Sequence, residues 1–292
     1  MLGLALIPIL ASGCAGIPKV LPPEARSQVT QTDVGSYIPQ AEVNVQYLQS
    51  AYGGGLIGAI VNASVNAAKA GSAEARAKRI REAAKGYDFR ANYWQAISNV
   101  IAATPWLMTR TFSGEPTNVV RIQPERVAQG AAMNIGTDFV ITPDHRVFEV
   151  LTGVSIFLPA KHKKAAAANM MAYHSARIGD EEGDKAAALW MADQGAAYRR
   201  AAAEGIEESA RLLRHVLDYM GGTTTGATRP AKVKADFVHG RGDFGIPAGR
   251  ATVKGKVLEE STERVVFQTE QGNFFSLPRA EVEITYLPPE KL

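Results

Sequence analysis

The pattern of apolar and polar residues divides the chain into an apolar start, a largely helical middle part and a strand-rich end. Residues 2–10 are apolar and uncharged. Between residues 46 and 220, apolar and alanine residues recur mainly at spacings of three and four, which predicts helices. Beyond residue 229, short apolar runs alternate with glycine-bearing or charged turns, which predicts strands.

The middle part is predicted to mix helices with a few strands. The predicted helices are 46–85, with interruptions near 53–55 and 71–72, then 89–103, 125–133, 164–176 and 185–220. The predicted strands are 106–112, 118–122, 137–141 and 146–158. The turn residues Thr142-Pro143-Asp144-His145 join the last two strands as a hairpin.

The last part of the chain is predicted to be all-β. Residues 221–228 are mostly glycine and threonine and indicate a linker. The strands expected beyond it are 232–238, 250–258, 264–268, 273–277 and 281–286. About sixty residues of this kind suggest a small closed barrel of the SH3-like type.

We therefore expect an α+β fold with a helix-rich body, a small and mostly antiparallel sheet, and a C-terminal all-β small barrel. The expected divisions are a signal peptide at 1–13, a lipid-anchored tether at 14–30, an α+β domain at 31–220, a linker at 221–229 and a small β-barrel domain at 230–288.

The first residues carry the most specific chemical pattern. The apolar run from Leu2 to Leu10 is followed by Ala11-Ser12-Gly13-Cys14. Such a run before small residues is typical of a secretory signal, and it is too short to span a bilayer. The alternatives are a plain cleaved signal peptide, or a buried strand in which Cys14 is a small core residue.

The segment that ends at Cys14 resembles the lipobox of bacterial lipoproteins. The resemblance implies cleavage between Gly13 and Cys14, a diacylglyceryl group on the Cys14 thiol, and acylation of the new amino end. Several acyl chains give stable membrane attachment without a transmembrane helix. Ala15, in place of an aspartate after the cysteine, implies the outer membrane of a Gram-negative bacterium, with the protein on its periplasmic face. The proline-bearing stretch 15–23 would then be a tether.

Composition describes an ordinary globular chain. Of its 292 residues 46% are hydrophobic and 21% charged, which is enough apolar mass for a sizeable core. The net charge of +3 is too small to indicate a nucleic-acid partner. Cys14 is the only cysteine, so the chain forms no internal disulfide.

A stripe of small residues is the candidate helix-packing or oligomerisation face. These residues recur at spacings of four and allow close approach of a second helix. They are Gly54, Gly55, Gly58, Ala59, Ala63, Ala67 and Gly71. The stripe is interpreted as tight packing within the domain or against a second copy of the chain, with membrane contact as the alternative.

The remaining patterns give weaker indications of a binding or catalytic site. The glycines of residues 240–245 have the spacing GxGxxG, but no helix follows them. In the acidic residues 180–184 the glycine stands at the fourth position and not at the sixth as in a calcium loop, and no glutamate stands at the twelfth. The five histidines have no metal-ligand spacing. Basic residues at 76–90 and 161–164 indicate either solvated surface or contact with anionic lipid or glycan. We expect no metal, no cofactor and no catalytic residue that the sequence could name.

The resulting hypothesis is a non-catalytic binding or assembly component of the bacterial envelope, with an unidentified protein partner. The order of helices and strands in the middle part loosely resembles that of the curli-secretion lipoprotein type, at the level of fold only. One alternative is an envelope hydrolase acting on peptidoglycan or lipid, with His174, Asp193 or Glu204 converging on a serine or a carboxylate. Another is an oligomeric secretion or pore accessory that uses the small-residue helix 54–71.

Overall fold

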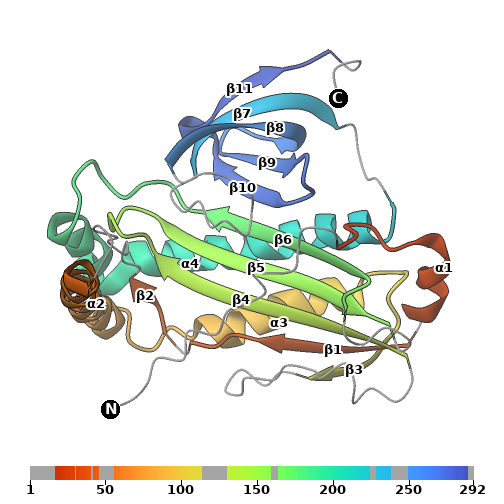
Figure 1. The fold of residues 1–292 in the computed structure, drawn as a ribbon, viewed down its shortest axis with the longest axis horizontal. Coiled ribbons are helices and arrows are strands. Elements are labelled where there is room, and N and C mark those ends of the chain that lie inside the picture. The colour runs from red at the N-terminus through yellow and green to blue at the C-terminus, as the bar shows by residue number, and fades with distance from the viewer. Residues whose placement is uncertain are drawn as a thin grey trace.

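A large mixed sheet, covered by helices on one face, forms the centre of the molecule (Figure 1). The computed structural model describes residues 17–29, 31–40, 42–45, 56–113, 130–158, 164–223, 228–237 and 249–288. The α-helices in these ranges are α1 (Pro23–Arg26), α2 (Leu56–Ala83), α3 (Phe89–Ala102) and α4 (Asp184–Met220). The strands are β1 (Thr32–Tyr37), β2 (Asn44–Val45), β3 (Thr109–Ser113), β4 (Ala131–Ile141), β5 (Phe148–Phe157), β6 (Ala167–His174), β7 (Arg229–Phe237), β8 (Gly249–Glu260), β9 (Arg264–Thr269), β10 (Phe274–Pro278) and β11 (Glu283–Tyr286).

The expected separate SH3-like barrel at the C-terminal end is wrong, because the last strands continue the sheet of the body. The strand order is β11-β7-β8-β9-β10-β6-β5-β4-β1-β3, and β2 pairs with β4. Phe274 to Ser276 of β10 pair in parallel with Met171 to Tyr173 of β6. At the far edge, β11 pairs with β7, and the sheet stays open.

The expectation of a small sheet in a helix-rich body is also wrong, because the sheet is large and mixed. The sheet has eleven strands, and the pairs β1–β3, β1–β4, β2–β4 and β6–β10 are parallel. The predicted hairpin at residues 142–145 does join two antiparallel strands, β4 and β5. Local turn chemistry was therefore readable from the sequence, whereas the parallel pairs join segments that are far apart along it.

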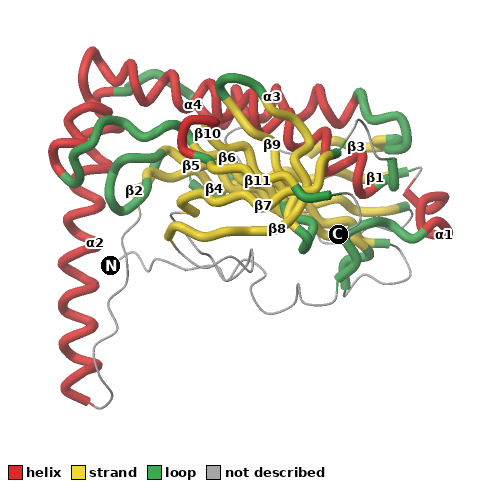
Figure 2. The backbone as a smooth tube through the Cα atoms, turned by 90° about the horizontal axis from the view of Figure 1, so that it is seen from above, coloured by secondary structure: helices red, strands yellow, loops and turns green. Residues whose placement is uncertain are grey.

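Helices α3 and α4 cover one face of the sheet (Figures 1 and 2). The stripe predicted on α3 is buried as expected, at Phe89, Tyr93, Ile97 and Val100. On α4 the predicted stripe is buried at Ile206, Leu213, Leu217 and Met220. Burial of these apolar side chains against the sheet holds the helices in place, since each contributes about 1.5–3 kcal/mol.

Helix α2 forms an arm that extends past the sheet (Figure 2). It has 28 residues and is therefore about 42 Å long. It runs through residues 71–72 without the predicted interruption. Its C-terminal part is attached to the body through Ala73, Ala77 and Ile80, which are buried in the main core.

Residues 164–176 were predicted as a helix, and the structure shows strand β6 there instead. The alanines of this segment favour a helix locally, but β6 lies between β5 and β10 and bonds to both. The predicted helix at 125–133 is wrong at its end for the same reason, since Ala131–Met133 open strand β4. The remainder of that segment, residues 125–129, lies outside the described part.

The described part of the expected tether, residues 17–29, packs onto the body. Leu21 and Val29 are completely buried and Ala25 is 3% exposed. Pro23 stands at the start of α1, where a missing amide hydrogen costs nothing. Leu21, Ala25 and Val29 recur every four residues. Their burial fixes to the body a segment whose prolines suggested an extended linker. Gly13 and Cys14 lie outside the described residues.

Candidate functional site

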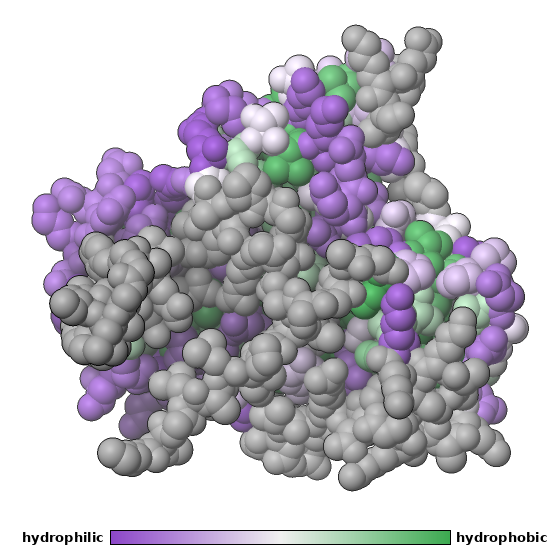
Figure 3. Space-filling model, viewed as in Figure 1, coloured by the Kyte–Doolittle hydropathy of each residue, from purple (hydrophilic) through white to green (hydrophobic). Residues whose placement is uncertain are grey.

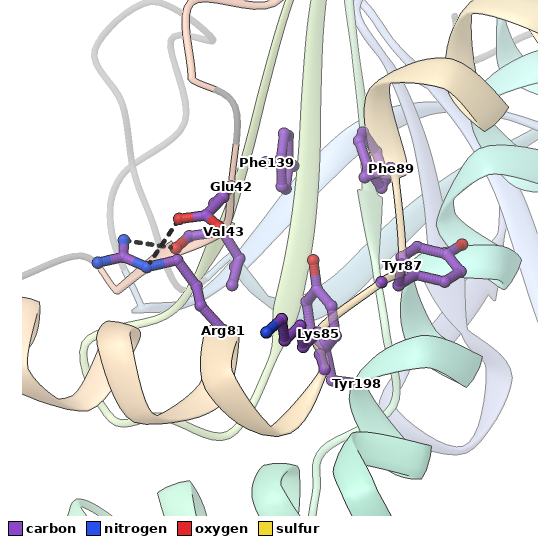
Figure 4. A pocket seen from close by; sticks show the side chains of 10 residues that line it. Glu42, Val43, Arg81, Lys85, Tyr87, Phe89, Phe139 and Tyr198 are labelled. Carbon is purple, nitrogen blue, oxygen red and sulfur yellow. Dashed lines mark hydrogen bonds and ion pairs between the residues drawn. The ribbon is translucent and has the colours of Figure 1, made fainter.

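A pocket of about 100 Å³ lies where the end of α2, the start of α3, strand β4 and helix α4 meet (Figure 4). Its lining residues come from segments distant in the sequence, and they are Glu42, Val43, Arg81, Ala84, Lys85, Gly86, Tyr87, Phe89, Phe139 and Tyr198. Arg81 and Lys85 belong to the basic residues 76–90, for which the sequence offered contact with anionic lipid or glycan as one interpretation. The other lining residues were not predicted as site residues, because only the fold brings them together.

Aromatic rings form one wall of the pocket. Phe89 stacks on Phe139 with ring centroids 4.1 Å apart. The Tyr87 and Tyr198 rings meet edge to face at 6.2 Å. The start of α3 positions Phe89, since the preceding Asp88 caps the helix by accepting a hydrogen bond of 3.0 Å from the Ala91 amide.

Charged groups form the rim. Arg81 pairs with Glu42 at 3.2 Å and donates at 3.3 Å to the carbonyl oxygen of Val43 (Figure 4). Arg81 also pairs with Glu74 further back on α2. The ammonium group of Lys85 makes no ion pair with a described residue. The rim therefore combines a neutralised guanidinium with one available cation.

The hydroxyl group of Tyr198 points into the pocket (Figure 4). The residue is 4% exposed, and its hydroxyl has no hydrogen-bond partner among the described residues. Burial raises the pKa of Tyr198, and the nearby Tyr87 raises it further. The side chain is therefore neutral at physiological pH and offers both a donor and an acceptor to an occupant.

A kink in α4 places Tyr198 at the pocket. The backbone leaves the helical conformation from Ala192 to Gly195, and Asp193, Gln194 and Gly195 have positive φ values. A Cβ atom at Gly195 would lie 3.1 Å from Cα of Ala84, at the end of α2. Only a residue without a side chain fits comfortably between the two segments.

A second polar cluster lies between α4 and the sheet, around Arg264. Its guanidinium donates to Glu204 at 2.7 Å, to the His174 carbonyl oxygen at 2.7 Å and to Ser276 Oγ at 2.8 Å. Ser276 in turn donates to Glu208 at 2.6 Å. The Arg264 guanidinium also lies 4.6 Å from the centre of the Tyr173 ring. This cluster ties the C-terminal strands to the helix.

The residues proposed for a hydrolase do not converge in an open pocket. His174 is 5% exposed, and its Nε2 lies 2.9 Å from a carboxylate oxygen of Glu149. Glu204 is held by Arg264, and Asp193 lies in the α4 kink. The cavity beside His174 has a volume of only about 10 Å³, room for a single water molecule.

The acidic loop 180–184 packs against the β4–β5 turn. Asp184 accepts a hydrogen bond of 2.6 Å from Arg76, and Arg146 lies 3.9 Å from Glu182. Arg76 holds the pKa of Asp184 below its usual range. These carboxylates pair with arginines across the loop. Within the described ranges no cluster of histidine, aspartate and glutamate side chains is arranged to hold a metal ion.

Most of the small-residue stripe lies on helix α2. Gly54 and Gly55 lie outside the described residues, while Gly58, Ala59, Ala63 and Ala67 fall on helix α2. At Gly71, a Cβ atom would meet nothing within 4 Å. The last position of the stripe is therefore open. No helix in the part of the chain that the structure describes is both long and apolar enough to span a bilayer.

The glycine-rich residues 240–245 and the basic residues 161–163 also lie outside the described part. The chain matches no model of a known protein family and no curated protein sequence.

Proposed function

We propose that this chain is a lipid-anchored lipoprotein of the outer membrane, facing the periplasm, and that it acts there as a non-catalytic binding or assembly component of the envelope. The sequence up to Cys14 supports the anchor. The pocket between α2, α3 and α4 supports the binding role, and its size and chemistry decide what kind of partner it suits.

The pocket is small. Sites for metabolites and cofactors have volumes of about 300–1,000 Å³. A dry cavity of about 150 Å³ holds one benzene-sized group. A pocket of about 100 Å³ therefore suits one side chain of a protein partner better than a whole small molecule. Insertion of a single anchor residue into such a pocket is a common way for protein partners to bind.

The chemistry of the rim narrows the partner further. The rings of Phe89, Phe139 and Tyr198 offer apolar contact, and the Tyr198 hydroxyl offers a hydrogen bond. Lys85 lines the pocket and makes no ion pair with any residue that the structure describes. A protein segment with an apolar side chain next to an acidic residue would satisfy both features.

Site-specific crosslinking in intact cells tests this role. A photoreactive amino acid at Glu42, whose side chain is 66% exposed, should give a discrete adduct with an envelope protein. Lys85→Glu in the same chain should reduce that adduct several-fold by charge repulsion. Lys78→Glu is the matched control on α2 and should leave it unchanged. No adduct, or equal loss in both variants, would reject the pocket as the binding site.

The anchor has its own test. Cys14→Ser should release the protein from the membrane fraction into the soluble periplasmic fraction, because the acylated thiol is lost. Continued sedimentation of Cys14→Ser with membranes would contradict the lipoprotein assignment.

A second candidate is an oligomeric secretion or pore accessory that uses α2. The specific observation is the open position at Gly71 on an arm that extends past the sheet (Figure 2). Light scattering of the acylated protein in detergent should then give a mass several times that of one chain. A monomer would reject this candidate without affecting the first.

A further inference from the structure

The N-terminal segment is fixed to one end of the sheet. Ile17 packs against Ala132, Phe157 and Ala165. The next residues are bonded to β6, since the Ala168 amide donates to the Pro18 carbonyl oxygen at 3.0 Å and Asn169 donates to that of Lys19 at 2.7 Å. These contacts lie where β4 and β6 begin and β5 ends.

Very little chain separates this end from the proposed lipid anchor. Cys14 precedes Ile17 by three residues. Consecutive Cα atoms are 3.8 Å apart, so the Cα atoms of the two residues are at most about 11 Å apart. A chain acylated at Cys14 cannot swing freely on a long tether, and this end of the sheet must lie close to the bilayer surface.

The surface at this end suits a membrane interface. Met108 is 63% exposed, the most exposed large hydrophobic residue of the described chain. Its carbonyl oxygen accepts a hydrogen bond of 3.0 Å from the Thr32 amide, and Thr32 pairs with Ala131 at the start of β4. Met108 therefore lies at the same end of the sheet as Ile17.

A cation at this end also suits a phospholipid surface. Lys164, next to Ala165, is exposed and has no ion-pair partner among the described residues. A lysine near an anionic membrane surface gains about 1 kcal/mol. Figure 3 shows a group of hydrophobic side chains among hydrophilic ones at the end that carries α1, and mainly hydrophilic side chains at the other end.

The geometry points to a docked orientation, which rests on the proposed acylation of Cys14: the sheet end that carries Ile17, Met108 and Lys164 lies on the phospholipid surface, and the pocket faces away from it. Phe139 in the pocket lies seven residues beyond Ala132 on β4. At about 3.3 Å per residue, the pocket is up to about 23 Å further from the membrane. It is then accessible to a partner from the periplasm.

Depth measurement with a single label tests this orientation. Because acylation consumes the only native thiol, an introduced cysteine is the one site that a fluorophore can modify. Met108→Cys and Lys164→Cys report on the docked end, and Lys78→Cys on α2 is the matched exposed control. The acylated proteins are reconstituted on vesicles of phosphatidylethanolamine and phosphatidylglycerol that contain a nitroxide-labelled lipid.

We expect several-fold stronger quenching at residues 108 and 164 than at residue 78, and no quenching in proteins that also carry Cys14→Ser. Equal quenching at all three sites in protein that floats with the vesicles would overturn the orientation while leaving the anchor intact. Protein that neither carries acyl chains by mass spectrometry nor floats would overturn the anchor, and the orientation with it.

Discussion

The phenolic oxygen of Tyr93 lies 2.7 Å from Oγ1 of Thr152 and joins helix α3 to strand β5 in the middle of the core. Thr137 of β4 donates a second hydrogen bond to the same oxygen at 2.9 Å. Burial raises the pKa of Tyr93 to about 12, although both threonine hydrogen bonds act to lower it. The folded state therefore favours the protonated form of the Tyr93 side chain.

This relationship predicts a loss of stability at alkaline pH. An unfolded tyrosine titrates near pH 10, so between pH 10 and 12 the unfolded chain loses the proton while the folded chain keeps it. The free energy of unfolding should fall by roughly 2–3 kcal/mol over this window from Tyr93 alone. Urea unfolding at pH 8 and pH 11.5 measures this fall.

Tyr93→Phe isolates the contribution. At pH 8 we expect it to be less stable than the unsubstituted chain by about 1 kcal/mol, since the two threonines keep their mutual hydrogen bond. At pH 11.5 that difference should shrink or reverse. A difference that does not change with pH would contradict the assignment.

Among the cations of the described chain, Arg264 should cause the largest loss of stability when it is replaced. Its side chain is 7% exposed, and its removal leaves the buried Glu208 with less compensation. We expect Arg264→Met to lower the free energy of unfolding by about 3–5 kcal/mol. Lys185→Met is the control, because the exposed pair of Lys185 with Glu181 contributes less than about 1 kcal/mol. Similar losses in both variants would show that the Arg264 cluster is not a tight link.

The burial of His145 predicts that the protein loses stability at acid pH. It is 4% exposed in the β4–β5 turn, where burial, and then the nearby Arg76, lower its pKa. The unfolded chain therefore binds more protons as the pH falls below about 6.5, and stability decreases. His145→Asn retains a residue that tolerates the positive φ of 65°. Between pH 7 and pH 5, thermal unfolding should show a smaller loss in this variant than in the unsubstituted chain. Parallel losses would rule out His145 as a source.

The substitution Gly255→Ala tests the close approach of β8 to β9. A Cβ atom at Gly255 would overlap the carbonyl oxygen of Gln268, so the strands would have to separate. We expect a destabilisation of about 1–3 kcal/mol. Gly153→Ala on β5, where a Cβ atom would meet nothing within 4 Å, should be nearly neutral. Chemical denaturation of both variants shows whether the destabilisation comes from the close packing at residue 255 or from the replacement of any strand glycine.

The sequence predicted those elements that depend on interactions between residues close together along the chain. The α3 stripe from Phe89 to Val100 and the turn at residues 142–145 follow from side-chain periodicity and turn chemistry, and both agree with the structure. Strand β6 could not be predicted in this way, because its alanines prefer a helix until two flanking strands bond to them. The continuation of the sheet through β10 depends on pairing with β6 about 100 residues earlier.

The pocket was not predictable for a related reason. Glu42, Phe139 and Tyr198 share no motif, and Tyr198 reaches the pocket only because α4 bends at residues 192–195. A run of ordinary helix-forming residues surrounds that bend. One signal was present: Gly195 interrupts an otherwise alanine-rich helix, and such a glycine often marks a close backbone contact.

The close approach of Gly195 to Ala84 places the attached end of α2 against the bend of α4, three residues before Tyr198. The arm and the pocket therefore share one junction. A substitution that changes how the C-terminal part of α2 packs on the body is expected to change the surroundings of Tyr198 as well.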